Sequence, residues 1–193
     1  MVEEKLKPAQ LIYAYSNGYF PMADDPEEGG EIYWHRPEQR GIIPLDSFHV
    51  SKNMKRFWRK NPYTLKLNTA FREVIKACAE RDRTWINDEI IDAYSSLSEM
   101  GYALSFEVWD ESELVGGLYG VTIGKAFFGE SMFSKASNTS KLALMHLVTF
   151  MKENDFVLLD TQYLNTHLEQ FGAVEIPDKN YMEQLASALA NSL

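Results

Sequence analysis

The segment from Gly116 to Ser134, GGLYGVTIGKAFFGESMFS, constrains the fold more than any other part of the chain. It is apolar and rich in glycine, which predicts strands of a sheet, and Glu130 is its only acid. In a regular strand Phe128, Glu130 and Met132 would share one face. Because burying an unpaired carboxylate is costly, Glu130 should have either a cationic structural partner or a chemical task. The residue type alone leaves both open.

A second polar signal follows about thirty residues later. The run 156–159, FVLL, predicts a buried strand that delivers Asp160 and Gln162 at its C-terminal end. Strand ends in mixed sheets commonly carry ligand-binding groups, although Asp160 could instead be a helix cap or a turn residue. Two carboxylates and an amide would then converge on one apolar pocket, which is more typical of an enzyme than of a scaffold.

The order of predicted elements indicates an α+β fold. Apolar periodicity and caps predict helices over 8–17, 68–80 (capped by Asn68), 87–100 (capped by Asn87), about 140–152, 164–171 and from about 180. Strands are predicted over 31–34, 103–109, 114–121, 125–133, 156–160 and 173–176. This order, helices followed by an antiparallel meander and then alternating elements, predicts a mixed sheet with helices packed on it. A length of 193 residues suits one compact domain with a small appendage.

Composition excludes several classes of protein. No apolar run approaches the ~18 residues of a membrane span, and the first residues, MVEEK, lack the apolar core of a signal peptide. The single cysteine, Cys78, allows no intramolecular disulfide, so a reducing, cytoplasmic compartment is expected. Four scattered histidines match no zinc-site spacing, and no phosphate-binding glycine motif occurs.

The charge is unevenly distributed. A formal net charge of −9 argues against broad nucleic-acid coating. Residues 24–31 hold five acids and no base, whereas residues 51–60 hold five bases and no acid. The basic segment is either a docking patch for one polyanion or a solvated surface. Five aromatic residues could stack on a nucleobase, although most aromatics are core residues: Tyr15, Tyr33, Trp34, Trp85 and Tyr94.

Nine short segments, in order over nearly the whole chain, carry a specific resemblance. They are AYSNGYFPM (14–22), IYWHRPEQR (32–40), SFHVSKNMKRF (47–57), TWI (84–86), EVWDESELVGGLYGV (107–121), FFGESMFS (127–134), SK (140–141), DTQ (160–162) and FGAVEIP (171–177). With these segments the chain resembles the leucyl/phenylalanyl-tRNA–protein transferase family. The resemblance implies a GNAT-like acyltransferase domain over 39–193, preceded by an abbreviated N-terminal α+β domain over 1–38.

The resemblance also implies an activity and its partners. The family transfers leucine or phenylalanine from aminoacyl-tRNA to the N-terminal α-amine of proteins that typically begin with arginine or lysine. The product carries an N-degron that the proteolytic machinery reads. No metal, coenzyme or membrane is implied.

By the same resemblance, Asp160 holds and polarises Gln162, which assists proton transfer from the attacking amine. Glu130 helps to bind and position the cationic acceptor N-terminus. Whether Asp160 and Gln162 form a proton relay or only orient the amine stays open.

Further contacts to the aminoacyl-tRNA follow from the resemblance. The pocket for the leucyl or phenylalanyl side chain is lined by Leu118, Phe127, Met132 and Leu159. Trp85 and Tyr94 match positions beside the terminal adenosine. The tRNA phosphates are met by Lys55, Arg56, Arg59 and Lys60.

The chain departs from the family pattern at a few positions. Two alternative functions are also considered. Met22 replaces a tryptophan, Leu104 replaces a histidine, and Thr161 replaces the middle cysteine of D-C-Q. A coenzyme-A-dependent N-acyltransferase is one alternative, but its pyrophosphate-binding loop is not found. An inactive tRNA- or peptide-binding adaptor is the other, and the retained Glu130, Asp160 and Gln162 argue against it.

Overall fold

A seven-stranded mixed sheet forms the centre of the protein, whose structure is a computed structural model describing residues 6–23, 31–81 and 84–190. The strand order is β4-β5-β6-β7-β8-β3-β9. The strands are β3 (Gln39–Ile42), β4 (Thr64–Leu67), β5 (Ala103–Asp110), β6 (Glu113–Ile123), β7 (Ala126–Ser134), β8 (Leu158–Gln162) and β9 (Val174–Pro177). Among these strands the β7–β8 pair is parallel and the other pairs are antiparallel.

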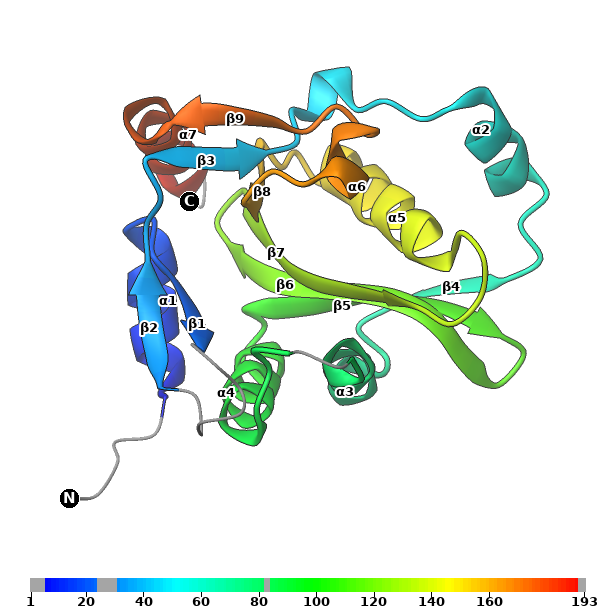
Figure 1. Cartoon of the computed structure of the whole chain (residues 1–193), viewed down its shortest axis with the longest axis horizontal. Coiled ribbons are helices and arrows are strands. Elements are labelled where there is room, and N and C mark those ends of the chain that lie inside the picture. The colour runs from blue at the N-terminus through cyan, green and yellow to red at the C-terminus, as the bar shows by residue number, and fades with distance from the viewer. Residues whose placement is uncertain (1–5, 24–30, 82–83, 191–193) are drawn as a thin grey trace.

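Helices cover both faces of the sheet (Figure 1). On one face lie α3 (Phe71–Ala79) and α4 (Asp88–Glu99), and on the other lie α5 (Thr139–Glu153) and the short α6 (Thr166–Glu169). Each face has its own core cluster of buried apolar side chains. The predicted α+β class, with a mixed sheet flanked by helices, is confirmed.

A small N-terminal unit packs beside the first of these clusters. It contains α1 (Pro8–Ser16) and the antiparallel pair β1 (Phe20–Ala23) and β2 (Ile32–His35). The C-terminal helix α7 (Asp178–Ala190) joins the same core as α1. The division at residues 38 and 39 stays a prediction, and residues 24–30 of the acidic segment lie outside the described residues.

The basic segment forms a helix that was not predicted. α2 (Lys52–Arg59) begins at Ser51, whose hydroxyl accepts from the Met54 amide at 3.2 Å. Met54 is the buried residue of this helix. Phe57 and Trp58 pack partly buried against the same core cluster, so the apolar face repeats at i, i+3 and i+4, a helical signal that was overlooked among the charges.

The predicted cap of α3 is wrong, whereas that of α4 is confirmed. Asn68 lies before α3 with φ +52°, α3 begins after Ala70 without a side-chain cap, and Glu107 from β5 instead holds the turn that leads into the helix. The carboxylate of Glu107 accepts from the amides of Thr69 and Ala70 at 2.8 and 2.7 Å. Burial acts to raise the pKa of Glu107, but the hydrogen bond from the Thr69 hydroxyl, together with those from the Ala70 amide and the side chains of Ser105 and Trp109, outweighs it and the pKa is lowered. Asn87 accepts from the Ile90 amide at 2.9 Å, as a helix cap does.

The expected alternation along β7 is also wrong. The register between β6 and β7 shifts at Glu130, which is an extra residue without a partner on β6. This β-bulge reverses the faces beyond it. Phe128 therefore belongs to the α3–α4 core, whereas Met132 packs against the α5 core.

No helix in the described ranges combines the length and hydrophobicity needed to span a bilayer.

Candidate functional site

The candidate site lies where β7 and β8 separate. Their parallel pairing runs from Ala126 and Leu158 to Phe128 and Asp160 and then ends. Just beyond, β7 carries its bulge at Glu130, while β8 ends at Gln162. Both strands thus leave regular geometry at the same level. Such irregular backbone re-aims side chains and is common beside binding sites.

Glu130 and Gln162 meet across this opening. The side-chain amide nitrogen of Gln162 donates to Glu130 Oε1 at 2.8 Å. The hydroxyl of Tyr15, on α1, donates to the same oxygen at 2.6 Å, and the hydroxyl of Tyr94, on α4, lies 3.4 Å from Oε2. Glu130 has no cationic partner among the described residues. Its contacts instead come from two phenols and an amide.

The environment of Glu130 favours its protonated form. Burial raises its pKa to about 8, opposed by the hydrogen bond from Tyr15 and reinforced by the negative charge of Asp160. Burial also raises the pKa values of Tyr15 and Tyr94, and the Glu130 charge adds to this effect. These phenols therefore stay protonated and act as hydrogen-bond donors at neutral pH.

Asp160 is fully buried and held by a cation. Its carboxylate accepts from Arg40 Nε at 2.9 Å and from Arg40 Nη2 at 2.7 Å. The Tyr181 hydroxyl donates to Asp160 Oδ2 at 2.6 Å. The guanidinium carbon of Arg40 lies 4.5 and 4.6 Å from the ring centroids of Phe20 and Tyr181. Burial disfavours the charge on Arg40, but Asp160 outweighs this and raises the Arg40 pKa.

Asp160 in turn fixes the backbone of Gln162. The Gln162 amide donates to Asp160 Oδ1 at 2.7 Å, and Gln162 adopts φ +64°, in the left-handed region. The neighbouring strand approaches closely because Gly41 has no side chain. A Cβ at Gly41 would lie 2.7 Å from the carbonyl carbon of Tyr163 and 2.9 Å from the amide nitrogen of Leu164. The structure thus brings together Glu130, Asp160 and Gln162, as the sequence predicts.

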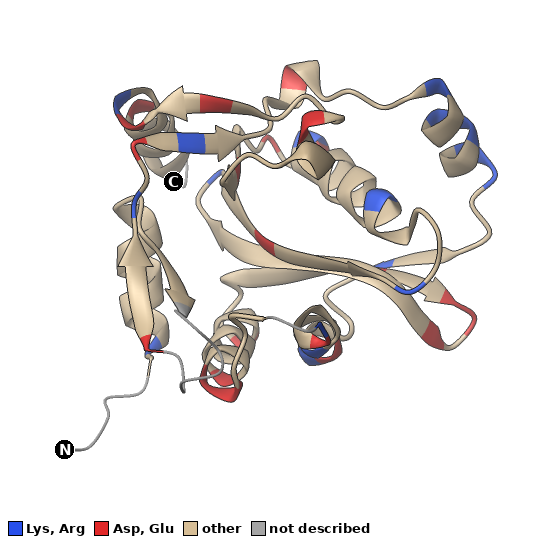
Figure 2. Cartoon of the chain, in the orientation of Figure 1, with Lys and Arg blue, Asp and Glu red and all other residues tan. Residues whose placement is uncertain are grey.

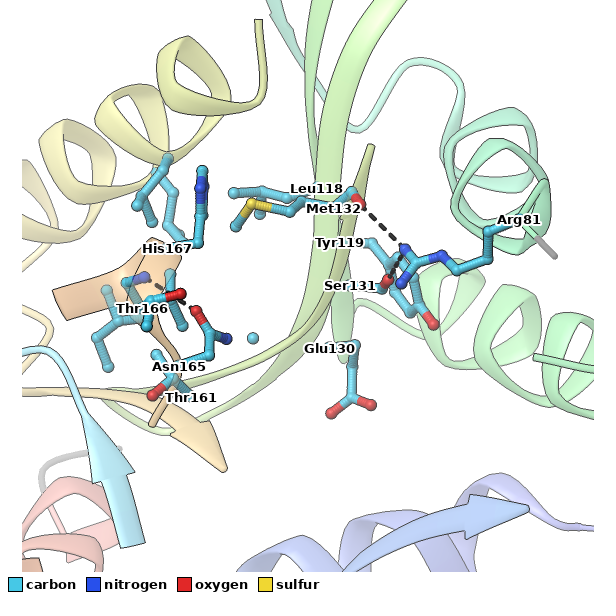
Figure 3. A pocket seen from close by; sticks show the side chains of 15 residues that line it. Arg81, Leu118, Tyr119, Glu130, Ser131, Met132, Thr161, Asn165, Thr166 and His167 are labelled. Carbon is cyan, nitrogen blue, oxygen red and sulfur yellow. Dashed lines mark hydrogen bonds between the residues drawn. The ribbon is translucent and has the colours of Figure 1, made fainter. Parts of the chain in front are cut away.

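An apolar cavity of about 420 Å³ opens beside Glu130 (Figure 3). Of the four side-chain pocket residues predicted, three line it: Leu118, Met132 and Leu159. Phe127 does not line it but is fully buried in the core behind. Two leucines of α5, Leu144 and Leu147, complete the apolar wall and were not predicted.

The two aromatics predicted beside adenosine differ in exposure. Trp85 is half-buried in the segment between α3 and α4, where it packs against the core. Tyr94 is fully buried, and its ring packs edge-on against Tyr119. A stacking role for the Tyr94 ring would require the core to open. Its observed contacts are those of its hydroxyl with Tyr15 and Glu130.

The predicted tRNA-binding cations lie on α2, at the far end of the molecule from α1 (Figure 2). All four are exposed: Lys55, Arg56, Arg59 and Lys60. No salt bridge to any of them occurs among the described residues. Their charge is therefore available to a polyanion.

Sequence reasoning missed Arg40, Tyr15 as a partner of Glu130, and Tyr181. Arg40 and Tyr15 belong to the matched segments IYWHRPEQR and AYSNGYFPM, and Arg40 sits on a short strand whose partners are distant in sequence. Tyr181 lies on the C-terminal helix and gave no signal.

The arrangement suits chemistry on an activated substrate. It offers an apolar cavity, a carboxylate that can hold or release a proton near neutral pH, and an amide held beside it. No cluster of three or more histidine, cysteine or acidic residues able to hold a metal occurs in the described part of the chain.

Comparisons with known proteins cover both parts of the chain. Residues 42–186 match the family model described as leucyl/phenylalanyl-tRNA protein transferase, and residues 4–38 match that of its N-terminal domain. The structure is similar to that of L-PGS from Bacillus licheniformis, with 13% identity, 84% of this chain and 53% of that chain covered, and a TM-score of 0.44. It is also similar to a functionally unknown conserved protein from Staphylococcus epidermidis, with 11% identity, coverages of 91% and 66%, and a TM-score of 0.45. The chain thus spans about half to two thirds of the length of these solved structures.

Proposed function

Because the chain belongs to the leucyl/phenylalanyl-tRNA protein transferase family, whose members are aminoacyltransferases, we propose that it transfers leucine or phenylalanine from aminoacyl-tRNA to the N-terminal α-amine of acceptor proteins. Acceptors beginning with arginine or lysine, and an N-degron as the product, belong to this proposal, as does a cytoplasmic location. The observation that carries it is the Glu130–Gln162 pair at the mouth of an apolar cavity.

The cavity is the proposed site for the transferred side chain. Leu118, Met132 and Leu159 offer apolar walls, and a methionine adapts to both a branched and an aromatic shape. Such a pocket discriminates by about 1–3 kcal/mol per methylene, so it favours large apolar side chains without selecting one of them strictly.

The chemical step requires little base strength. The ester of an aminoacyl-tRNA is already activated, and an α-amine with a pKa of about 7.7–8.0 is partly neutral at pH 7. Glu130, with a pKa of about 8, is matched to that amine. In its ionised form Glu130 accepts a proton from the attacking nitrogen. Gln162 donates its amide N–H to Glu130, which leaves its carbonyl oxygen to orient the amine.

The reaction balances without a further reactant. The amine nitrogen bonds to the ester carbonyl carbon, and the bond from that carbon to the ribose oxygen breaks. One proton passes from the nitrogen, by way of Glu130, to the departing ribose oxygen.

Asp160 acts in this scheme as a positioning residue. Both of its oxygens accept hydrogen bonds from Arg40, and they also accept from the Gln162 backbone and the Tyr181 hydroxyl. Both oxygens of a carboxylate held in this way are already occupied by donors, which makes it a firm anchor. We therefore favour orientation of Gln162 over a proton relay through Asp160.

The exposed cations of α2 are the proposed contacts to tRNA phosphates. Contacts of this kind are salt-sensitive and largely independent of base sequence. Trp85 stays the proposed neighbour of the terminal adenosine.

The test is transfer of labelled leucine from leucyl-tRNA to peptides that begin with arginine, lysine, aspartate or alanine, without added coenzyme A. We expect transfer to the arginine and lysine peptides, and a fall of about 100-fold or more in its rate in Glu130→Gln. Transfer to none of the peptides while tRNA still binds would support an inactive adaptor and overturn the proposal.

A further inference from the structure

Arg81 lies at the rim of the cavity and belongs to none of the sites predicted from the sequence. It follows α3, and its side chain is exposed. Its Nη2 donates to the Ser131 hydroxyl at 2.8 Å and to the Met132 carbonyl at 3.1 Å, and its Nε donates to the Cys78 carbonyl at 2.9 Å. Figure 3 shows its guanidinium group on the other side of the Glu130 strand from Thr166 and His167.

These hydrogen bonds fix the position of the Arg81 guanidinium group but do not use all of its N–H donors. Nη1 makes no hydrogen bond within the described ranges, and the nearest part of the sheet is the bulged segment that carries Glu130. Arg81 therefore presents one free donor edge and a full positive charge at the rim. Holding the group in advance lowers the entropy cost of binding a ligand.

A second hollow of about 310 Å³ continues from this point. It lies between the end of α3 and β7, and its lining includes Ala77, Glu80, Arg81, Met132, Phe133 and Lys135. Arg81 and Met132 line both this hollow and the apolar cavity, so they form the ridge between the two. The cavity and the hollow are therefore neighbours on the two sides of Arg81 and Met132.

The charges along this hollow favour an anion. Lys135 lies 3.8 Å from Glu80, and both side chains are about half or more exposed. Such a surface pair contributes little, which leaves Lys135 free to exchange Glu80 for another partner. The hollow thus offers two cations and one acid in a protein whose net charge is −9.

We propose that this hollow binds the phosphodiester backbone at the 3′ end of the donor tRNA, with Arg81 contacting the phosphate next to the aminoacylated nucleotide. This inference rests on the proposed function. The planar guanidinium of arginine matches the geometry of phosphate oxygens. Lys135, which also lines the hollow, meets the preceding phosphate. Trp85, half-buried against the core four residues after Arg81, stays the proposed neighbour of the terminal adenosine.

An acceptor peptide fits the hollow less well. An N-terminal ammonium, and an arginine or lysine side chain beside it, would meet the like charge of Arg81 at the rim. The acid that suits them is Glu130, inside the cavity mouth. The donor therefore takes the hollow and the acceptor approaches by another route.

The test compares two donors that differ in phosphate. One is leucyl-adenosine, which has none, and the other is leucyl-CCA, whose trinucleotide has two phosphodiesters. We expect Arg81→Ala to lower kcat/KM about tenfold with leucyl-CCA and to leave leucyl-adenosine unchanged, as for loss of one charged hydrogen bond. Lys135→Ala has a smaller effect, again with leucyl-CCA alone. The matched control is Arg72→Ala on α3, the helix that precedes Arg81; Arg72 pairs with Asp92 at the surface, and its loss should change transfer from neither donor.

Equal losses with both donors would show that Arg81 supports the bulge or the ester chemistry, and no loss with either would show no contact; both outcomes overturn the proposal. A loss that depends on the acceptor peptide and not on the donor would assign the hollow to the acceptor and overturn it too. If the wild type transfers from neither of these donors nor from leucyl-tRNA, the proposed function fails separately. In that case the binding of deacylated CCA and of adenosine tests the Arg81–phosphate contact by itself. Arg81→Ala must weaken CCA binding and leave adenosine binding unchanged.

Discussion

The side-chain amide of Gln162 donates to Glu130 across 2.8 Å, just where the parallel strands β7 and β8 cease to pair. Each residue sits at an irregularity of its own strand, a bulge in one case and a left-handed backbone in the other. The bond therefore joins two side chains that a regular sheet would hold apart or turn away. The mouth of the apolar cavity lies beside it.

The raised pKa of Glu130 predicts a steep pH profile for transfer. The reactive state needs both a neutral amine and an ionised Glu130, whose pKa values are about 7.7–8.0 and about 8. Below pH 7, log kcat/KM should therefore rise with pH with a slope that approaches two. In Glu130→Gln only the amine titrates, so the slope falls to about one and the rate drops about 100-fold or more. Steady-state rates between pH 5.5 and 9 measure this, and equal slopes would remove Glu130 from the proton transfer.

The control for this profile is the pH dependence of stability, which reports the same pKa without any substrate. An unfolded glutamate has a pKa of about 4.3, and the folded value is about 8. The folded state thus holds the proton more tightly, so this stabilisation is complete at low pH and is lost as pH rises from about 4.3 to about 8. Urea unfolding at pH 5 and pH 8 should show a smaller difference in Glu130→Gln than in the wild type.

The Arg40–Asp160 pair predicts a large loss of stability when one partner is removed. Asp160→Ala leaves the guanidinium of Arg40 buried and uncompensated, which costs about 3–5 kcal/mol in the free energy of unfolding. The matched control is Asp178→Ala, because Asp178 accepts two hydrogen bonds from Arg36 at about one-third exposure. Its loss should cost about 1 kcal/mol or less. Similar losses for both variants in denaturant unfolding would contradict the buried character of the Arg40 pair.

The local pattern of apolar residues, glycines and cap residues in the sequence predicted much of the fold. The buried run 156–159 and the glycine-rich segment 116–134 reveal the central strands, and the α4 cap at Asn87 follows from residue type. The convergence of Glu130, Asp160 and Gln162 was predicted because strand ends collect polar groups.

What was missed depends on contacts between distant parts of the chain. Strand β3 is only four residues long, and it is defined by its pairing with β8 and β9, which are distant in sequence. Arg40 therefore gave no local signal. The bulge at Glu130 is set by its register with β6, which a single strand does not reveal. Phe127 was placed in the pocket by the resemblance, although it lies behind the cavity wall.

The cavity lining predicts which substitution changes side-chain preference. Met132→Ala removes part of the wall, so kcat/KM should shift about tenfold toward phenylalanine relative to leucine. Phe127→Leu lies behind the wall, so it should lower stability and leave the leucine-to-phenylalanine ratio unchanged. Competition between leucyl- and phenylalanyl-tRNA gives this ratio directly. A change of ratio in Phe127→Leu alone would extend the pocket into the core behind its wall.

The exposed helix α2 predicts a weaker dependence of tRNA binding on salt when its charges are removed. Replacing Arg56 and Arg59 by alanine should weaken tRNA binding and reduce the slope of log K against log salt by about one for each phosphate that the protein no longer neutralises. Transfer from leucyl-CCA should not change, because that donor lacks the duplex that α2 would contact. Lys152→Ala, an exposed lysine on α5, is the control. An unchanged salt slope would make α2 a solvated surface.

The close approach at Gly41 predicts a substitution that reaches the site through the backbone. An alanine there would place its Cβ within 3 Å of main-chain atoms of Tyr163 and Leu164, which no side-chain rotation relieves. Strand β3 must then move from β8, so Gln162 loses its place beside Glu130. We expect a stability loss of about 1–3 kcal/mol and a fall in transfer of about tenfold or more, since small displacements of positioned groups are costly. Gly101→Ala is the control, because Gly101 has φ +82° but open space around it. That change should cost about 1–2 kcal/mol of stability and leave transfer intact, so an active Gly41→Ala would disprove that β3 holds Gln162 in position.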